Sequence, residues 1–555
     1  MKDVSVLIGG KAGDGINSAG TLVAQLLNTI GYTLYMYFDY PSLIRGGHNF
    51  AIIRGSEQDI GACWKPVDFV LALNNETLER HRDRCSQKTA IIYNADLVKS
   101  AGVGSAGQGI QVQEILTGEH APAIMGNSAI IGGFAKAAGI EWDVVTAVFN
   151  AHIPKGIDLN LKVAKKAYDQ LGTVLPLGRV QNPPRPLLTG NEAIGLGMVK
   201  GGLDAYVSYP MTPSSSLLHF LAEHKEKFGI TVVHPENEIA VILMALGFAY
   251  AGKRSAVGTS GGGFCLMTEG LSLAGMAELP LVLLVSQRTG PSTGLPTYTA
   301  QSDLQFISYA GQGEYPRLVV APGDAQESLY WSEIAMNMAW KFQIPVFILT
   351  DKTLSEGTYS SSPEDIPELV REESPAWQGT APYLRYADAP SGISPLAFPG
   401  MKDAVIKANG YMHDEAGITT EDAALTVQMT NKRLRKWEGL AEEMQRYPGV
   451  NVSGKPDAST ALLCWGSTKG VCNEIASRLG IKVIQPIVLL PFPAIQVKKA
   501  MSGIKKVVAV EENATGQLAM LAEQHGIAVD ERILWYDGRP ISPEDLLEKV
   551  QGVVV

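Results

Sequence analysis

Short apolar runs alternate with helix-like runs through the middle of this 555-residue chain. The strand-like runs cover residues 205–208, 231–234, 256–259, 281–286, 317–321 and 346–350, and longer stretches of helical character lie between them. Such alternation predicts a parallel sheet with helices on both faces. The first and last parts of the chain show the same pattern, so we predict a multidomain α/β protein.

Length and composition shifts suggest where the domains end. A chain of 555 residues is too long for one core, and roughly three or four domains are expected. The stiff, proline-rich stretch 182–186 closes a first domain at residues 1–181. A second domain is expected over residues 187–360 and a last one over residues 451–555. Residues 361–450 break the pattern, and we interpret them as an extended connection that contains a helix.

Charge and hydropathy exclude several classes of function. The formal net charge is −10 and the sequence pI is about 5.5, which argues against a nucleic-acid partner. No apolar run approaches the roughly 20 residues that span a bilayer, so no membrane role is expected. The residues that follow Met1 do not form a signal peptide, and the expected setting is the cytoplasm.

The cysteines and histidines show no metal-binding spacing, and we expect no metal site within this chain. None of the cysteines forms a C-x-x-C pair, and no H-E-x-x-H is present. Scattered cysteines in a cytoplasmic chain are usually small, buried apolar residues. They are Cys63, Cys85, Cys265, Cys464 and Cys472.

A glycine cluster at residues 9–15 follows the first strand-like run and allows more than one interpretation. It lacks the G-K-[ST] of a P-loop. As a dinucleotide fingerprint it is degenerate, because Gly13 and Gly15 fit but Ser18 occupies the third glycine position; Asp39 could then contact a ribose. As a thiamine-diphosphate G-D-G…N pattern it lacks the asparagine. Two interpretations of the cluster remain: a glycine turn that allows close packing of a strand and a helix, and a turn that contacts a phosphate.

The most informative turn follows residues 205–208. Its two prolines fix the backbone between a strand and a helix, and Ser214 is expected to cap that helix. Hydroxyl groups beside the free N–H groups of a helix start suit an anion such as a carboxylate. The turn reads Tyr209-Pro210-Met211-Thr212-Pro213-Ser214-Ser215-Ser216.

Two acids, Glu236 and Glu238, precede a strongly apolar helix. The helix dipole explains one acid at such a position but not two. Because apolar residues follow Glu238 directly, we expect its carboxylate to be at least partly buried. A buried carboxylate has a raised pKa and can share a proton with a ligand nitrogen.

Two further polar turns complete a candidate pocket. Ser260 lies in a glycine-rich turn, and Arg288 follows the strand-like run 281–286, where an arginine can bind a carboxylate in a bidentate manner. With Thr212 and Glu238, these residues lie at successive strand ends of one sheet. Strand ends at one edge face the same crevice, so we expect the four residues to meet there.

These motifs resemble those of the 2-oxoacid:ferredoxin oxidoreductases. Residues 209–215 are similar to that family's Y-P-[IM]-T-P-S-S signature, residues 287–297 to its second signature, and residues 511–517 to a weaker third one. The resemblance covers most of the chain. It implies a gamma-type α/β domain, a pyrimidine-binding alpha domain with a parallel sheet and a transketolase-C-terminal-like α/β domain. The chain thus resembles the fused gamma–alpha subunit, as in 2-oxoglutarate:ferredoxin oxidoreductase.

The resemblance implies a thiamine diphosphate site. Glu238 would bind the aminopyrimidine ring nitrogen, and Tyr209, Pro210 and Met211 would line the cofactor. Thr212 and Arg288 would hold the 1-carboxylate of a 2-oxoacid and act with Glu238 in catalysis. Thr297 is expected to line the same pocket.

The substrate and the direction of the reaction follow less directly from the sequence. On the residues alone, Arg45 in its glycine turn is more often a solvated arginine than an anion ligand. The resemblance implies that Arg45 binds a second carboxylate of the substrate. This favours 2-oxoglutarate over pyruvate or another 2-oxoacid. Oxidative decarboxylation with coenzyme A would then give succinyl-CoA, and the reverse reaction would fix CO₂.

The chain lacks two sites that the resemblance leads us to expect. It has no G-D-G…N site for the diphosphate and no cluster cysteines. The resemblance implies that a beta subunit supplies Mg²⁺ and a [4Fe–4S] cluster, in a heterotetramer of two alpha and two beta subunits that exchanges electrons with ferredoxin. A nicotinamide-dependent dehydrogenase and a non-catalytic assembly subunit are the alternatives.

Overall fold

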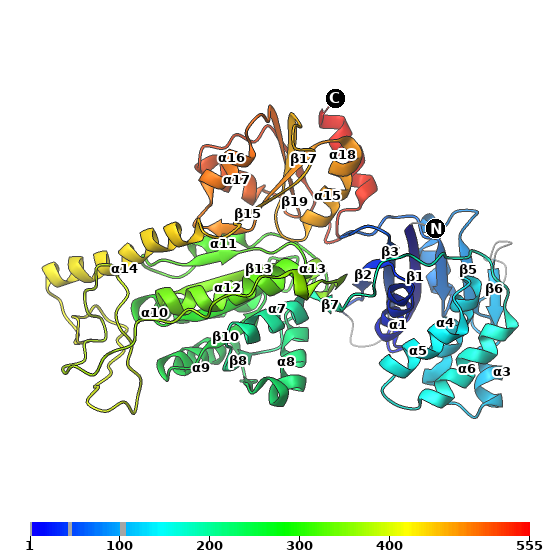
Figure 1. The fold of residues 1–555 in the computed structure, drawn as a ribbon, viewed down its shortest axis with the longest axis horizontal. Helices are drawn as coiled ribbons and strands as arrows, with labels where there is room; N and C mark the ends of the chain where they lie inside the picture. Colours follow the sequence, from blue (N-terminus) through cyan, green and yellow to red (C-terminus); the bar gives the residue numbers. More distant parts are fainter. Residues whose placement is uncertain (1–2, 43–46, 100–106, 555) are drawn as a thin grey trace. The chain divides into compact units, whose positions relative to one another are not determined.

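The computed structural model describes residues 3–42, 47–99 and 107–554. The chain divides into two compact units, each described by itself below (Figure 1). The first contains residues 1–188, 357–362 and 542–548, and the second contains residues 189–356, 363–541 and 549–555. Both units are mixed α/β structures, which confirms the predicted fold class. No helix within the described ranges combines the length and apolar character needed to cross a bilayer.

The first unit is built on an eight-stranded sheet in the order β6-β5-β4-β1-β3-β2-β14-β7. β3 lies between β1 and β2 and is antiparallel to both. The strands are β1 (Asp3–Lys11), β2 (Thr33–Asp39), β3 (His48–Ser56), β4 (Phe69–Ala72), β5 (Ala90–Asn94), β6 (Gly107–Ile110), β7 (Leu187–Thr189) and β14 (Thr358–Ser360). The helices are α1 (Ile16–Thr29), α2 (Asn75–Arg80), α3 (Val112–Gly118), α4 (Gly126–Ala137), α5 (Trp142–His152) and α6 (Ile157–Gln170), with 3-10 turns η1 (Arg82–Arg84) and η3 (Ala123–Met125).

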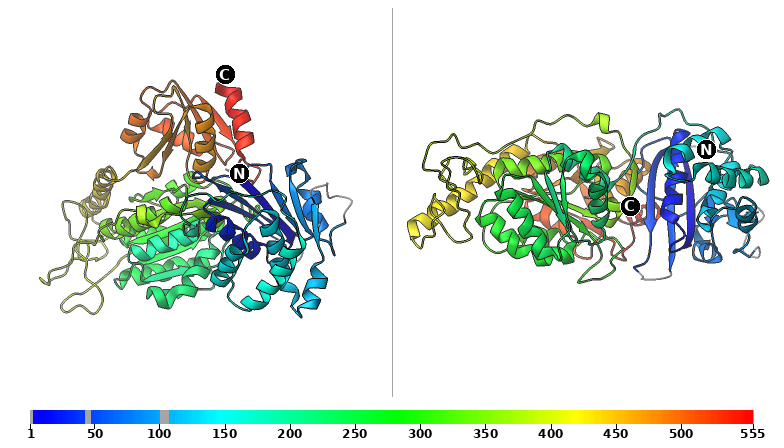
Figure 2. Two further views of the ribbon diagram at one scale, coloured as in Figure 1. Left: turned by 45° about the vertical axis from the view of Figure 1, so that its right-hand side comes forward. Right: turned by 90° about the horizontal axis from the view of Figure 1, so that it is seen from below.

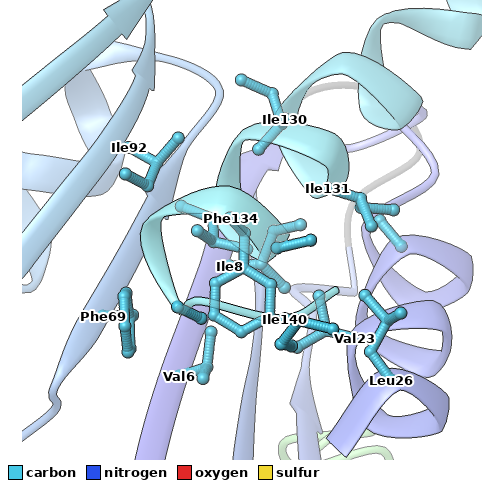
Figure 3. Packing of buried hydrophobic residues seen from close by; sticks show 14 of the residues in the cluster. Val6, Ile8, Val23, Leu26, Phe69, Ile92, Ile130, Ile131, Phe134 and Ile140 are labelled. Atoms are coloured by element: carbon cyan, nitrogen blue, oxygen red, sulfur yellow. The ribbon is translucent and has the colours of Figure 1, made fainter. Parts of the chain in front are cut away.

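Aliphatic and aromatic side chains from this sheet and its helices form the core of the first unit (Figure 3). Ile8 and Phe69 point from β1 and β4 toward Leu26 of α1 and Phe134 of α4, and all four are fully buried. The rings of Phe69 and Phe134 meet edge to face, with centroids 5.2 Å apart. Burial of each such side chain stabilises the fold by about 1.5–3 kcal/mol.

The glycine cluster forms the turn between β1 and α1. Gly15 has a φ of 71° at the start of α1, where a residue with a Cβ would be strained. The Asp14 carboxylate accepts a hydrogen bond from the Lys11 N–H within the same turn, at 2.8 Å. Asp39 is buried and accepts a hydrogen bond from the Tyr37 hydroxyl, and its strand is not adjacent to β1. The acid of the dinucleotide interpretation is therefore buried and already bonded within its own strand.

The second unit contains a seven-stranded sheet in the order β18-β12-β13-β11-β10-β8-β9. Neighbouring strands from β12 to β9 are parallel, as predicted, and only the edge strand β18 is antiparallel. The strands are β8 (Ala205–Ser208), β9 (Thr231–Val233), β10 (Ser255–Thr259), β11 (Leu281–Gln287), β12 (Leu318–Val320), β13 (Pro345–Asp351) and β18 (Val488–Leu490).

Helices cover both faces of this sheet (Figure 2). Val257 and Leu283 belong to the core shared with α9 and α10, whereas the alternate residues Ala256 and Leu284 belong to the core shared with α7, α8 and α12. A capping box formed by Thr189 and Glu192 is present at the start of α7. The helices are α7 (Gly190–Lys200), α8 (Ser215–Phe228), α9 (Glu238–Tyr250), α10 (Gly261–Met276), α11 (Leu304–Tyr309), α12 (Ala325–Phe342) and α13 (Lys352–Glu356).

A five-stranded sheet, in the order β15-β17-β16-β19-β20, forms the rest of the second unit. Its strands are β15 (Val450–Gly454), β16 (Thr460–Leu463), β17 (Lys482–Pro486), β19 (Lys506–Glu511) and β20 (Glu531–Leu534). The remaining helices are α14 (Ala423–Met444), α15 (Thr468–Leu479), α16 (Ala494–Ala500) and α17 (Gln517–Gln524), and η4 (Pro363–Asp365) is a 3-10 turn. The last helix, α18 (Pro543–Val554), begins in the first unit and ends in the second. β18 follows β17 closely in the chain and pairs with β12, so the chain passes directly from one sheet of this unit to the other.

Candidate active site

Four polar turns lie at one edge of the seven-stranded sheet. β11, β10, β8 and β9 are neighbours in that order and run parallel. The 209–215 turn follows β8, Glu238 follows β9, Ser260 follows β10, and Arg288 follows β11. The strand order therefore places these residues at successive carboxyl ends, where open α/β sheets bind ligands.

The prediction that Ser214 caps α8 is wrong. Ser214 is fully buried, but its hydroxyl donates to the carbonyl oxygen of Met211 at 2.8 Å and makes no bond to the helix N–H groups. Its backbone already has helical φ and ψ values of −74° and −13°, so the side chain cannot reach forward in the manner of a cap. Asn191 on α7 donates to the carbonyl of Pro213 and to the Ser216 hydroxyl, which fixes the turn from the side.

Arg288 contacts the same turn across the sheet edge. Its Nη1 donates to the carbonyl oxygen of Thr212 at 3.0 Å, so the structure brings these two residues together through the backbone of Thr212. The Nε of Arg288 is buried and has no hydrogen-bond partner. Burial lowers the pKa of the guanidinium from its ordinary value. One N–H of Arg288 thus positions the turn while another remains free for a ligand.

Glu238 is buried at the first turn of α9, and only 4% of its surface is exposed. The cap of this helix is Asn237, whose side chain accepts from the Ala240 N–H at 2.9 Å. Glu238 is therefore not needed as a cap, and its Oε1 has no hydrogen-bond partner. Glu236, two residues earlier, is exposed. The two neighbouring acids have different environments.

Gly263 shows how closely the polar groups approach one another. A Cβ atom at this position would lie 2.2 Å from Oγ1 of Thr259 and 2.7 Å from Oε1 of Glu238, so only glycine fits. The hydroxyl of Thr259 and the carboxylate of Glu238 consequently face the same small space at the start of α10.

Several buried polar atoms at this edge have no hydrogen-bond partner. Buried polar groups nearly always have hydrogen-bond partners, and each exception needs an explanation. A polar ligand that bonds to these atoms is the explanation that their common location favours. The atoms are Glu238 Oε1, Thr259 Oγ1, Ser260 Oγ and Arg288 Nε; Thr297 Oγ1, in the loop after β11, is also buried without a partner.

Asp303 is a further acid at this edge that the sequence interpretation missed. Its Oδ2 would lie 2.3 Å from a Cβ at Gly261, so the carboxyl faces the start of α10. Burial raises the pKa of Asp303 to about 6. A carboxyl group with this pKa can gain or lose a proton near neutral pH. Its side chain forms no cap of the short helix α11, and a helix of six residues gives no periodic signal that could have revealed this position.

The third motif, residues 511–517, holds the segment that follows the second signature. Glu512 N–H donates to the Gln301 side chain at 3.0 Å, and Gln301 N–H donates to the carbonyl of Glu512 at 2.7 Å. The side chain of Asn513 donates to the carbonyl of Gln301, and that of Gln517 donates to the carbonyl of Ser302. The 511–517 motif thus fixes residues 301–305 a few positions beyond Thr297.

Two further predictions concern Arg45 and the cysteines. Arg45 lies outside the described residues. Cys464 and Cys472 are buried as expected, but Cys265 is exposed on α10, because its position on that helix faces away from the sheet. Among residues 3–42, 47–99 and 107–554, no group of three or more His, Cys, Asp or Glu side chains is arranged to hold a metal ion.

An apolar surface adjoins the site. Ile239, Leu243 and Met244 on α9 and Leu266 on α10 are 41–50% exposed. The first of these residues follows Glu238 directly. Exposed apolar side chains that occur together, rather than singly, indicate a surface that another molecule covers.

Comparisons with known proteins agree with this geometry. Residues 196–432 match the family model described as "Pyruvate flavodoxin/ferredoxin oxidoreductase, thiamine diP-bdg", and residues 5–170 match "Pyruvate ferredoxin/flavodoxin oxidoreductase". The chain is 31% identical to subunit alpha of 2-oxoacid:ferredoxin oxidoreductase 2 from Aeropyrum pernix, over 100% of this chain and 98% of that protein. It is 28% identical to 2-oxoglutarate oxidoreductase subunit KorA from Mycobacterium tuberculosis, over 94% of this chain and 87% of that protein.

A solved structure is similar over the full length. The 2-oxoglutarate:ferredoxin oxidoreductase from Magnetococcus marinus, with 2-oxoglutarate, coenzyme A and succinyl-CoA bound, is 29% identical, with a TM-score of 0.87. The match covers 100% of this chain and 99% of that chain. The parallel-sheet edge with its buried glutamate, the match to a thiamine-diphosphate-binding domain and the full-length similarity to alpha subunits lead to one conclusion. This chain belongs to the family of 2-oxoacid:ferredoxin oxidoreductase alpha subunits.

Proposed function

We propose that this chain is the alpha subunit of a 2-oxoglutarate:ferredoxin oxidoreductase, which converts 2-oxoglutarate and coenzyme A to succinyl-CoA and CO₂ and passes the electrons to ferredoxin. The reverse reaction would fix CO₂. The observation that carries the proposal is Glu238: a buried carboxylate with an unpaired oxygen, at the ligand-binding edge of a parallel sheet. The cytoplasm remains the predicted location.

Glu238 is proposed to hold the pyrimidine end of thiamine diphosphate. When bound, this cofactor supplies the electron sink for decarboxylation of the 2-oxoacid. The free Oε1 of Glu238 fits a ring nitrogen as a hydrogen-bond partner, and a buried carboxylate can hold the proton at that nitrogen. The turn formed by Tyr209, Pro210 and Met211 lies at the end of the neighbouring strand, where it would contact the same ring.

Arg288, Thr212 and Thr297 are proposed to bind the substrate. Arg288 presents an unpaired buried N–H, which suits a carboxylate that the site shields from water. Thr297, in the loop that follows β11, presents a buried hydroxyl without a hydrogen-bond partner. Because Arg288 also bonds to the backbone of Thr212, it fixes the position of the threonine side chain relative to its own free N–H.

The choice of 2-oxoglutarate depends on Arg45 and on the relatives. Relatives named for 2-oxoglutarate cover most of this chain, and the similar Magnetococcus structure has that substrate bound. Arg45 is proposed to bind the second carboxylate, which pyruvate lacks.

A beta subunit is proposed to complete the site. The sequence has no G-D-G…N pattern, so the diphosphate, Mg²⁺ and a [4Fe–4S] cluster are assigned to that partner in a heterotetramer of two alpha and two beta subunits. The apolar surface of Ile239, Leu243, Met244 and Leu266 supports this assignment, because it begins next to Glu238 and is suited to burial against another chain.

Substitution of Glu238 in the assembled complex tests the proposal. Glu238→Gln keeps the size and polarity of the side chain but removes the charge and the ability to hold the proton. We expect turnover with 2-oxoglutarate to fall by about 100-fold or more, in the range for loss of an acid–base group. The matched control is Glu236→Gln, which changes an exposed acid of the same turn and should leave turnover unchanged.

Equal activities of the two variants would contradict the proposal and favour a non-catalytic assembly subunit. Thiamine diphosphate binding, measured by calorimetry on the same variants, separates a binding defect from a catalytic one. A nicotinamide titration addresses the remaining alternative, in which the glycine turn after β1 would bind a dinucleotide.

A further inference from the structure

A second cluster of charged residues lies at the far end of α10. Glu278, just beyond this helix, is 2% exposed and accepts hydrogen bonds from Nζ of Lys432 at 2.8 Å and from Nζ of Lys436 at 2.5 Å. Arg385 donates to the backbone carbonyl of Glu278 at 2.7 Å. Since α10 has 16 residues, about 24 Å of helix separates this cluster from the glycine turn at the active-site edge.

The cluster contains more positive than negative charge. The buried cations are Arg385, Lys432, Arg433 and Lys436, and the carboxylate of Glu278 is the acid that they enclose. A buried charge without a counter-charge is costly, and a surplus of cations in one place raises that cost. The two lysines hold the pKa of Glu278 well below its usual range, and burial lowers the pKa of Lys436 to about 7.

Arg433 is the member of the cluster with an unused donor. It is 5% exposed, and its Nη2 donates to the hydroxyl of Thr430 at 3.3 Å. Its Nη1 is buried without a hydrogen-bond partner. A guanidinium forms strong paired hydrogen bonds to carboxylates and phosphates, so this free N–H indicates an anionic ligand.

Arg433 lies against a cavity. The cavity has a volume of about 890 Å³, and Phe306, Tyr315, Tyr411 and Thr430 line it together with Arg433. A smaller pocket shares Arg433 and Tyr315 with it and extends to Glu278 and Lys436. The aromatic rings suit an apolar or flat ligand body, and a few polar groups that converge at one end are typical of small-molecule sites.

The acids that line the large cavity are Glu269 and Glu314, and both are exposed. Their charges are screened by water, whereas the cations beside Glu278 are not. The field at the inner end of the cavity is therefore positive.

We propose that this cavity binds an organic anion, with a carboxylate or phosphate group bonded to Arg433 and an apolar body between Tyr315 and Tyr411. This site is separate from the proposed active site and goes beyond the proposed function. Because α10 begins at the active-site edge and ends at this cluster, a ligand here would contact the same helix that carries Gly263.

Calorimetric titration of the full-length chain, with any subunit that co-purifies, tests the site without a requirement for turnover. The probes are inorganic phosphate, which represents the anionic group alone, and benzoate, which adds a flat apolar body to a carboxylate. Both are titrated against a chloride buffer of equal ionic strength. Saturable binding of at least one probe is expected. Arg433→Met should raise its Kd at least tenfold, whereas Arg446→Met, at an exposed position after α14, should not change it.

Two further variants keep the test decisive if Arg433→Met does not fold. Arg433→Lys retains the charge but loses the planar pair of donors, and a several-fold weaker Kd is expected. Tyr411→Ala changes an exposed cavity residue and should weaken benzoate but not phosphate. Binding of phosphate alone would identify the phosphate class. Absence of saturable binding, or equal Kd values for the Arg433 and Arg446 variants, would overturn the proposal.

Discussion

Glu238 and Glu236 are two positions apart and illustrate how one turn places the same side chain in two environments, one buried and one exposed. The apolar helix after Glu238 requires burial, so its environment is predictable from the sequence. The Ser214 cap was not predictable, because the choice between a helix N–H and a nearby carbonyl depends on backbone angles that composition does not encode. Asp303 was missed since α11 has only six residues and gives no periodic signal.

One prediction at the scale of a single residue concerns Arg45 and the choice of substrate. In the assembled complex, Arg45→Ala should lower kcat/KM for 2-oxoglutarate at least about tenfold, because a hydrogen bond to a charged group contributes about 1.5–3 kcal/mol. Activity with pyruvate, which has no second carboxylate, should change little. Arg82→Ala, at an exposed position of the same unit, is the control. Equal losses with both substrates would remove the argument for 2-oxoglutarate.

At the scale of the elements, alternation in the sequence was sufficient to predict the parallel sheet but not the order of its strands. The antiparallel β18 at one edge of this sheet and the position of β3 between β1 and β2 could not be predicted, because a strand of a few residues does not specify its partner. The contact between the 511–517 motif and Gln301 joins residues 211 positions apart. A single sequence contains no local signal for such a pair.

The side chain of Gln517 provides a direct test of that contact. Its amide donates to the carbonyl of Ser302 at 2.7 Å and accepts from the Gln305 N–H at 3.0 Å. Gln517→Ala removes both bonds, each worth about 1 kcal/mol, and kcat/KM should fall roughly 5- to 30-fold as residues 301–305 lose their position.

The same substitution at Gln524, exposed at the other end of α17, should have no effect on kcat/KM. A role limited to stability would lower Tm while kcat and KM at low temperature stay normal, and that outcome would contradict a positioning role for the 511–517 motif.

At the scale of the whole molecule, a buried acid couples folding to pH. Glu512 accepts from the Ile541 N–H and the Thr299 hydroxyl, and burial raises its pKa to about 8, with the nearby charge of Asp351 as a further cause. The folded state therefore binds more protons than the unfolded state between the ordinary pKa of about 4.5 and this value. Stability consequently falls as pH rises through that window.

Glu512→Gln should reduce this dependence. The amide preserves an acceptor and a donor for the same partners but cannot ionise. The Tm of the wild-type protein should decrease more between pH 6 and pH 8.5 than the Tm of the variant. Lys436, whose lowered pKa acts in the opposite direction, is present in both proteins and cancels in the comparison. Parallel Tm profiles would show that Glu512 is already ionised at pH 6.

Assembly gives a prediction at the same scale. Because this chain is proposed to hold only the pyrimidine half of the cofactor, the isolated chain with thiamine diphosphate, 2-oxoglutarate, coenzyme A and a redox dye should show no turnover. Addition of the co-purifying subunit should restore it. Turnover by the isolated chain would disprove the proposed division of the site.

The pairing of β18 with β12 restricts how this protein can be shortened. A fragment that ends near residue 450 would retain the whole parallel part of the seven-stranded sheet. It would also leave the backbone groups of Val319 and Val320, both fully buried in the intact chain, on an open edge without hydrogen-bond partners. Open edges of this kind recruit strands from other molecules, so such a fragment should precipitate unless a replacement for Val488–Leu490 is supplied.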